Sequence, residues 1–399
     1  MTDLDDFRRS IREWIVASAP ESLYGARKGR FDGHWGGRKA TPAPDVKRWF
    51  DAALERGLTA PTWPKEYGGG AFSREEAQVF DEELAALVLP PPLVGVGLTM
   101  IGPTLLDYGT EEQKREHLPR IVRGEIRWAQ GYSEPGAGSD LASLSTRAVR
   151  DGDDFIVTGQ KTWTTYADKS DWIFALVRTN TEVKKQLGIT FILVDMATPG
   201  VSTRPIELIS GWSPFCETFF DEVRVPANNV VGAIDAGWTV GKALLGYERA
   251  MIGEAMSGEL ASAEEALVGR ARRAFGVRTG PLPDETLRTE IARTAMDIEC
   301  FAFAIERLRQ SVHEGQKPGP ESSTLKIVGS DLKQRRWELG VKVAGPDGLG
   351  WEGPAFEESD LRTTREWLRS RANTIEGGSS EIQLNIIAKQ VLGLGGGTP

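Results

Sequence analysis

The sequence predicts a multi-domain α+β protein in which a helical segment, a β-barrel-like segment and a C-terminal helical bundle follow one another. Apolar residues recur at helical spacing in the first 122 or so residues and again after Trp238. Between these blocks the apolar runs are short, rich in β-branched residues and separated by polar or Gly/Pro turns, as is typical of strands. We therefore divide the 399 residues into segments 1–124, 125–232 and 233–399.

The first segment is expected to be mostly helical. Its opening helix carries an apolar face made of Leu4, Phe7, Ile11, Trp14 and Ile15. A second helix ends at Gly57, and residues 21–45 read as a loop. Two capping boxes, Ser73 with Glu76 and Thr110 with Gln113, mark further helix starts, because each side chain can satisfy the other's free backbone donor.

The second segment is expected to be a β domain. A hairpin is predicted for 145–159, since β-branched runs flank the polar turn Asp151–Asp154. Further strands are expected at 173–177, 188–195 and 217–226.

Helical periodicity returns in the third segment. One long helix is expected from Trp238 through Met251 and Met256 toward Phe275. Three more are expected: one carrying Leu287, Ile291, Ile298 and Leu308, one over 332–343, and one over 380–392.

Composition excludes several classes of function. With 48 Lys and Arg against 57 Asp and Glu, the net charge is -9, and no basic cluster is interleaved with aromatic residues as a nucleic-acid groove requires. Two cysteines and three scattered histidines give neither a disulfide framework nor the spacing of metal ligands. No apolar run approaches the roughly 20 residues of a membrane span. Because the acidic N-terminal sequence resembles neither a signal nor a transit peptide, we expect a cytoplasmic protein.

The sequence W-A-Q-G-Y-S-E-P-G-A-G-S-D-L at 128–141 is the most informative stretch of the chain. Gly131, Gly136 and Gly138 permit close approach of the backbone, and Ser133 and Ser139 offer small hydrogen-bonding groups. This combination predicts a binding site for a flat, phosphorylated cofactor, placed beside the strand that ends in G-Q-K-T-W-T-T at 159–165. A structural Gly-Ser loop next to a structural tryptophan is the alternative.

These two stretches resemble the flavin-binding signature of the acyl-CoA dehydrogenase family. The order of helical, β and helical blocks is also that of the family, so the resemblance covers nearly the whole chain. It implies FAD-dependent α,β-dehydrogenation of an acyl-CoA thioester to the trans-2-enoyl-CoA, with electrons passed to an electron-transfer flavoprotein. The residues that the resemblance places at FAD in these stretches are Gln130, Tyr132, Ser133, Gly138, Ser139, Trp163 and Thr165. Ser139 is also expected to contact the substrate.

Further FAD contacts are implied by the third segment. Ser379 and Glu381 match the family's C-terminal contact to the FAD adenosine. Arg272 and Gly345 match positions that reach the FAD of a neighbouring subunit, which implies a homo-oligomer or a heterotetramer with a paralogue. A basic helix end at Arg272 and a helix-terminating turn at Gly345 explain the same residues without a cofactor.

The family reaction requires a carboxylate that removes the α-proton of the thioester. The usual base position falls here on Gly377, and Glu376 lies one place early. Glu248, immediately before Arg249 in L-G-Y-E-R-A, matches the branch of the family that includes the isovaleryl-CoA and long-chain dehydrogenases. The base is therefore Glu248 or Glu376, or this chain has none. Arg249 is expected to contact the substrate or to order the site, although an adjacent Glu and Arg can also be an ordinary solvated pair.

Three functions remain open from the sequence. The first is an acyl-CoA dehydrogenase that acts on a bulky or branched substrate such as a steroid side chain. The second is a non-catalytic or half-site subunit of a heteromeric enzyme. The third is a flavin oxidase or monooxygenase on the same fold.

Overall fold

The computed structural model describes residues 3–27, 33–246, 263–313, 319–320 and 322–395. Its contacts divide the chain into two compact units. Unit 1 comprises Met1–Ile206 and Pro214–Tyr247, and unit 2 comprises Glu207–Ser213 and Glu248–Pro399. The first two predicted segments thus lie in unit 1 except for Glu207–Ser213, and the three-part division of the sequence stays a prediction.

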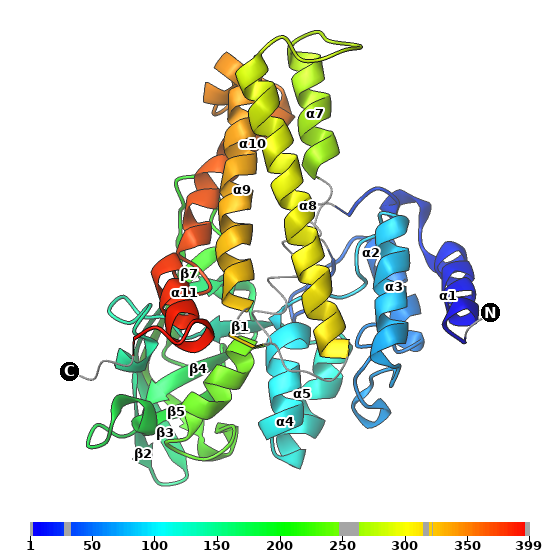
Figure 1. Ribbon diagram of the computed structural model, residues 1–399. Coiled ribbons are helices and arrows are strands. Elements are labelled where there is room, and N and C mark those ends of the chain that lie inside the picture. The colour runs from blue at the N-terminus through cyan, green and yellow to red at the C-terminus, as the bar shows by residue number, and fades with distance from the viewer. Residues whose placement is uncertain (1–2, 28–32, 247–262, 314–318, 321, 396–399) are drawn as a thin grey trace. The chain divides into compact units, whose positions relative to one another are not determined.

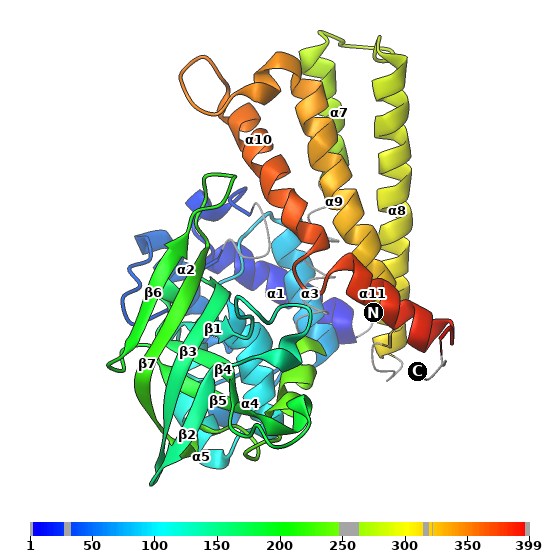
Figure 2. The same ribbon diagram turned by 90° about the vertical axis from the view of Figure 1, so that its left-hand side faces the viewer.

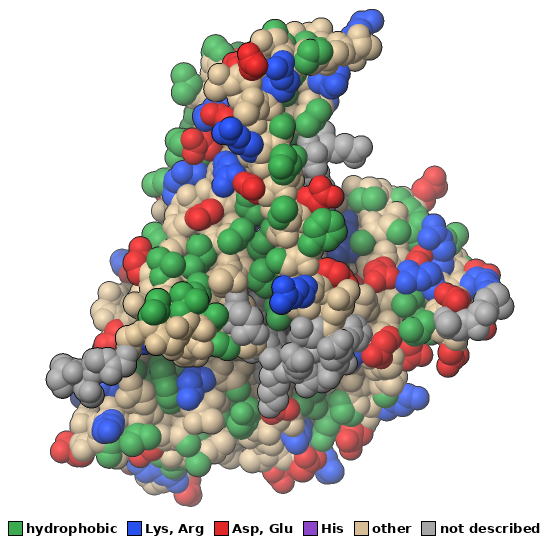
Figure 3. All heavy atoms as spheres, in the orientation of Figure 1, with side chains coloured by type: hydrophobic (Ala, Val, Ile, Leu, Met, Phe, Trp, Pro, Cys, Tyr) green, Lys and Arg blue, Asp and Glu red, His purple; other side chains and the backbone are tan. Residues whose placement is uncertain are grey.

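The helices of unit 1 follow the sequence pattern closely. Their bounds are α1 (Asp3–Ser18), α2 (Pro44–Glu55), α3 (Arg74–Ala86), α4 (Gly102–Tyr108) and α5 (Glu111–Val122). Ile11 and Ile15 are fully buried on the expected face of α1, and both capping boxes are present, at Ser73 and Thr110. Basic and acidic side chains lie intermixed over α1 and α3 in Figure 3.

The strands of unit 1 form a seven-stranded sheet in the described part of the chain. Their bounds are β1 (Trp128–Gly131), β2 (Arg147–Asp151), β3 (Asp154–Thr165), β4 (Trp172–Arg178), β5 (Ile189–Asp195), β6 (Val201–Ile206) and β7 (Phe215–Pro226). The order is β1-β4-β2-β3-β7-β6, with β5 paired to β4, and Figure 2 shows β3, β7 and β6 side by side. The hairpin β2–β3 confirms the prediction. Strand β6 was not predicted, because it is largely exposed and contains Pro205, which weakens the sequence signal of a strand.

An aromatic cluster joins α5 to the sheet. The His117 ring meets the Trp128 ring edge to face at 5.2 Å and the Trp172 ring at 4.8 Å. One turn earlier on α5, the Gln113 amide donates to the carbonyl oxygen of Val230 at 2.8 Å. These contacts explain why the helices and the sheet form one unit.

His117 is expected to make unit 1 sensitive to acid. It is 1% exposed, its Nδ1 finds no partner in the described part of the chain, and burial lowers its pKa from 6.5 to about 4. The unfolded chain therefore binds the proton first, so stability present above the unfolded pKa is lost as the pH falls. Between about pH 7 and pH 5 the loss is about 2 kcal/mol. Urea unfolding of the wild type and of His117→Phe at both pH values measures it; equal losses in the two proteins would contradict the expectation.

Unit 2 is a helical bundle over its described residues. Its helices are α7 (Ala263–Ala274), α8 (Glu285–His313), α9 (Ser322–Ala344), α10 (Glu358–Ser370) and α11 (Ser380–Ile386), the last continued by a π-helical turn over Ile387–Val391. Figure 1 shows α8 and α9 packed along each other. Residues 247–262 of the predicted long helix, with Met251 and Met256, lie outside the described residues.

Helix α10 had no sequence prediction. Its buried side chains are Thr363, Thr364 and Ser370, and small hydroxyl residues give no apolar periodicity. Over the residues that the structure describes, no helix is both long and apolar enough to cross a membrane.

Candidate functional site

A buried ion pair holds the glycine-rich loop against β3. The Lys161 ammonium is fully buried and donates to Glu134 Oε1 at 2.7 Å and to the Tyr132 carbonyl oxygen at 3.2 Å. Glu134 also accepts the backbone N–H groups of Ser145 at 2.7 Å and Thr146 at 3.0 Å. The carboxylate therefore ties the loop to the residues that lead into β2.

Both members of this pair are charged at neutral pH. Burial alone would raise the pKa of Glu134, but the Lys161 charge and the donors around the carboxylate lower it to about 2. Burial is the largest influence on Lys161 and lowers its pKa to about 8, against the opposing effect of Glu134. A buried pair of this kind is costly to break, because either partner alone would be an uncompensated charge.

The tip of the loop is open on its outer side. The Glu134 and Ala137 backbones close a tight turn through two hydrogen bonds of 3.0 Å. A Cβ added at Gly136 or Gly138 would meet no atom of the chain within 4 Å, and neither glycine has a positive φ. Gly131 differs, since its Cβ would lie 2.7 Å from the Ile173 side chain. Internal packing therefore accounts for Gly131, whereas Gly136 and Gly138 leave room for a group outside the chain.

Trp163 projects from an irregular part of β3 beside this loop. It lies in a register shift of the β3–β7 pairing, has a φ of 60°, and is 55% exposed. Such a conformation costs a bulky residue about 1–3 kcal/mol and is typical of functional sites. The Thr162 N–H donates to the Ser133 carbonyl oxygen at 2.9 Å, which confirms the expected adjacency of the strand and the loop.

The other predicted residues of unit 1 lie around the same loop. Gln130 is half-buried on β1, and Thr165 pairs with Phe215 at the end of β3. The Tyr132 ring is buried and perpendicular to the Phe174 ring, with centroids 6.1 Å apart, and Ser139 is exposed. Their contacts with a cofactor or a substrate stay predictions.

Sequence reasoning missed Glu134 and Lys161 as supports of the site. The signal was present, since a glutamate follows Ser133 in the loop and a lysine precedes Trp163 by two residues in an otherwise uncharged stretch. Only the pairing of the loop with β3 shows that these two charges meet.

In unit 2, the Glu376 carboxylate accepts hydrogen bonds from neighbouring side chains in the turn before α11. It accepts from the Arg369 guanidinium at 2.6 Å and from the Asn373 amide at 2.5 Å. Gly377 and Gly378 follow with φ of 64° and 91°, a region that disfavours any residue with a side chain. The usual base position thus has a backbone suited to glycine, and the adjacent carboxylate stabilises the turn.

The remaining predicted cofactor contacts of unit 2 fall into two groups. Ser379 caps α11 and Glu381 lies in its first turn, next to the stretch whose Asn373 carbonyl accepts from Ser330 of α9 at 2.9 Å. Arg272 lies in the last turn of α7, and Gly345 follows α9, where Val343 packs in the same core cluster as Ala271. Since α9 rises about 1.5 Å per residue, Ser330 and Val343 are about 20 Å apart. The two groups therefore lie at well-separated points of the bundle.

Glu248 and Arg249 lie outside the described residues. Within the described residues, no group of three or more His, Cys, Asp or Glu side chains could hold a metal ion.

Three family models match the chain in sequence order. They are acyl-CoA dehydrogenase, N-terminal domain, over residues 26–125, middle domain over 129–223, and C-terminal domain over 235–392. The chain belongs to the acyl-CoA dehydrogenase family and is an oxidoreductase of that family, which depends on a flavin. The resemblance seen in the sequence and the predicted fold class are thereby confirmed.

Individual relatives cover almost the full chain. The acyl-CoA dehydrogenase IpdE1 of Mycobacterium tuberculosis is 36% identical over 99% of this chain and 98% of that protein. Among solved structures, a variant of the Tcur3481-Tcur3483 steroid ACAD matches with a TM-score of 0.79 and 31% identity over 99% of both chains. The ChsE4-ChsE5 complex from Mycobacterium tuberculosis matches with a TM-score of 0.75 and 29% identity over 100% of this chain and 99% of that one.

Proposed function

We propose that this chain binds FAD along the loop 131–139 and the end of β3, and dehydrogenates a bulky acyl-CoA thioester. The observation that carries the proposal is the exposed, left-handed Trp163, held beside a loop tip whose glycines face open space. Gly136 and Gly138 would let backbone N–H groups approach a pyrophosphate closely. Ser133 and Thr165 would supply hydroxyl and backbone contacts, and the Trp163 indole would cover the ring system.

Gly136→Val is expected to weaken FAD binding by at least about tenfold while the free energy of unfolding changes by less than about 0.5 kcal/mol. A Cβ at this position meets no atom of the chain within 4 Å, so the larger side chain is expected to obstruct a ligand rather than the fold. Flavin content after purification and the urea midpoint measure the two effects.

Gly269→Val is the matched control, because Gly269 lies on α7 and its Cβ would come no closer than 3.5 Å to another side chain. Full flavin retention by Gly136→Val would mean that the cofactor does not approach this loop.

The proposed base is Glu248. Its carboxylate would remove the α-proton, while Arg249 contacts the thioester substrate or orders the site. A bound FAD would accept the β-hydrogen with its electron pair, for later transfer to an electron-transfer flavoprotein. Glu376 is less suited to proton removal, since Arg369 and Asn373 already occupy its carboxylate.

The names of the relatives support a steroid-derived or similarly bulky acyl group and a heteromeric assembly. Tcur3481-Tcur3483 is named a steroid ACAD, and ChsE4 is named in complex with ChsE5. Arg272 and Gly345 lie near one end of α9. The stretch before Ser379 and Glu381 contacts α9 about 20 Å away along the bundle. This separation supports an assembly in which one FAD is contacted by two subunits.

Anaerobic titration of the purified protein with straight, branched and steroid-derived acyl-CoA thioesters tests the reaction. Loss of the visible flavin absorbance with one class of thioester is the expected result. A flavin-free protein would favour the half-site subunit, and rapid oxygen consumption during turnover would favour an oxidase or monooxygenase.

A further inference from the structure

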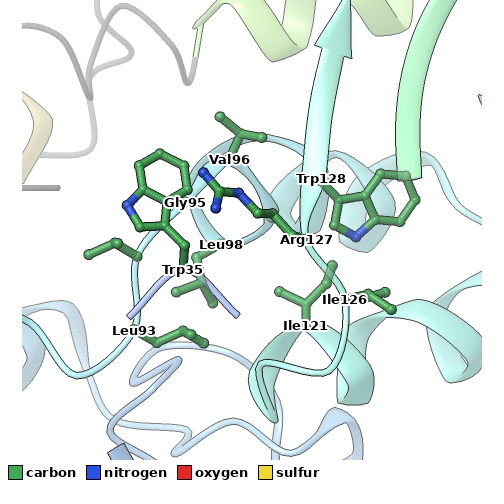
Figure 4. A pocket seen from close by; sticks show the side chains of 11 residues that line it. Trp35, Leu93, Gly95, Val96, Leu98, Ile121, Ile126, Arg127 and Trp128 are labelled. Carbon is green, nitrogen blue, oxygen red and sulfur yellow. The ribbon is translucent and has the colours of Figure 1, made fainter. Parts of the chain in front are cut away.

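Arg127 takes part in an aromatic stack that joins three distant parts of unit 1. Its guanidinium carbon lies 4.4 Å from the centroid of the Trp35 ring and 4.9 Å from that of the Tyr166 ring. The two rings also meet each other edge to face, with centroids 5.5 Å apart. Figure 4 shows the Arg127 side chain directed toward the Trp35 indole, at the rim of a small pocket between β1 and the segment 93–98.

The two aromatic rings of this stack are the main contacts of the Arg127 guanidinium. Its backbone N–H donates to Asp171 Oδ2 at 2.8 Å, and its buried Nε has no hydrogen-bond partner among the residues that the structure describes. A planar guanidinium interacts favourably with the face of an aromatic ring, the more so when water is partly excluded. The ring faces of Trp35 and Tyr166 are therefore the principal partners of this part of the side chain.

Backbone hydrogen bonds of neighbouring residues fix the position of Trp35 in the stack. The adjacent His34 carbonyl accepts from the Val94 N–H at 2.8 Å, and the Gly37 N–H donates to the Gly124 carbonyl oxygen at 2.9 Å. A Cβ at Gly95, which has a φ of 124°, would lie only 3.1 Å from the indole ring. The backbone around Trp35 is thus bonded to two loops of the helical part of unit 1, and the indole packs closely on Gly95.

Tyr166 is the member of the stack with a strained backbone. It adopts a left-handed backbone conformation, φ 48° and ψ 37°, three residues after the left-handed Trp163. Its N–H donates to the Pro214 carbonyl oxygen at 2.8 Å. An aromatic residue keeps such a conformation only when its surroundings hold it there. The surroundings of this ring include the Arg127 guanidinium.

We propose that Arg127 is a positioning residue for the cofactor-covering segment Trp163–Tyr166. By holding the Tyr166 ring beside Trp35, it keeps the backbone of this segment in the conformation that presents Trp163 and Thr165 to the flavin. The inference rests on the flavin site proposed above. Arg127 acts through Tyr166, and its effect is therefore measurable without turnover.

The test compares Arg127→Met with the wild type in two measurements. Amide hydrogen exchange over 163–166, measured in FAD-free protein, is expected to become about tenfold faster, and the FAD dissociation constant to rise about tenfold. Arg127→Lys keeps the charge but loses the planar stack, so it is expected to fall between the two proteins in both measurements.

Arg56→Met is the matched control, since it removes a guanidinium that lies 5.2 Å from the Trp14 ring in another part of unit 1. Exchange and FAD affinity in Arg127→Met equal to those of Arg56→Met would overturn the role of Arg127. If Arg127→Met does not fold, the same two measurements on Arg127→Lys and Trp35→Phe test the role of Arg127 instead. Failure of the wild type to bind FAD would overturn the cofactor proposal instead, while the exchange experiment would still show whether Arg127 holds the turn.

Discussion

Glu248→Gln is expected to slow substrate-dependent loss of flavin absorbance by about 10²- to 10⁴-fold, the usual contribution of a general base. The amide is nearly isosteric with the carboxylate but accepts no proton at neutral pH, so substrate binding should persist. Single-turnover absorbance under anaerobic conditions, with the thioester that reacts best with the wild type, gives the rate.

Glu376→Gln is the matched control for this substitution. Its Oε2 accepts from Arg369 and its Oε1 from Asn373, and the glutamine keeps one of these two acceptors. Because neither contact takes part in proton removal, the rate should stay close to that of the wild type. The opposite pattern, with Glu376→Gln inactive and Glu248→Gln active, would make Glu376 the base. Equal rates in all three proteins would show that neither carboxylate removes the proton.

Lys161→Met is expected to lower the free energy of unfolding by about 3–5 kcal/mol, because it leaves the Glu134 carboxylate buried without its counter-charge. Glu134 would still accept from Ser145 and Thr146, but these neutral donors do not replace the ammonium group. Since the pair holds the glycine-rich loop against β3, flavin should also be lost. Urea unfolding and flavin content measure the two effects.

Lys185→Met is the control from the same loop region. Lys185 pairs with Asp140 at 2.8 Å, but both side chains are more than half exposed, so its removal should cost less than about 1 kcal/mol. The double variant Lys161→Met/Glu134→Gln should recover part of the lost stability, since it removes the unpaired charge. If Lys161→Met were no less stable than Lys185→Met, the pair would not support the loop.

The sequence alone was sufficient for the fold class, the family and most of the elements. Apolar periodicity located α1, and the two capping boxes located the starts of α3 and α5, because these signals depend on neighbours within a few residues. The sequence pattern did not predict β6 or α10. Strand β6 is largely exposed and α10 buries threonines, so neither element shows an apolar pattern. The adjacency of the glycine-rich loop and the end of β3 was also predicted from the motif.

Tertiary structure alone decided which groups support that loop. The contact between Glu134 and Lys161 joins residues 27 positions apart, and the Arg127 stack joins segments around residues 35, 127 and 166. No local pattern encodes such contacts, because they depend on strand pairing and on the packing of the N-terminal helices against the sheet. The left-handed conformations of Trp163 and Tyr166 are equally invisible in the sequence, since neither residue favours them locally and only the surrounding packing maintains them.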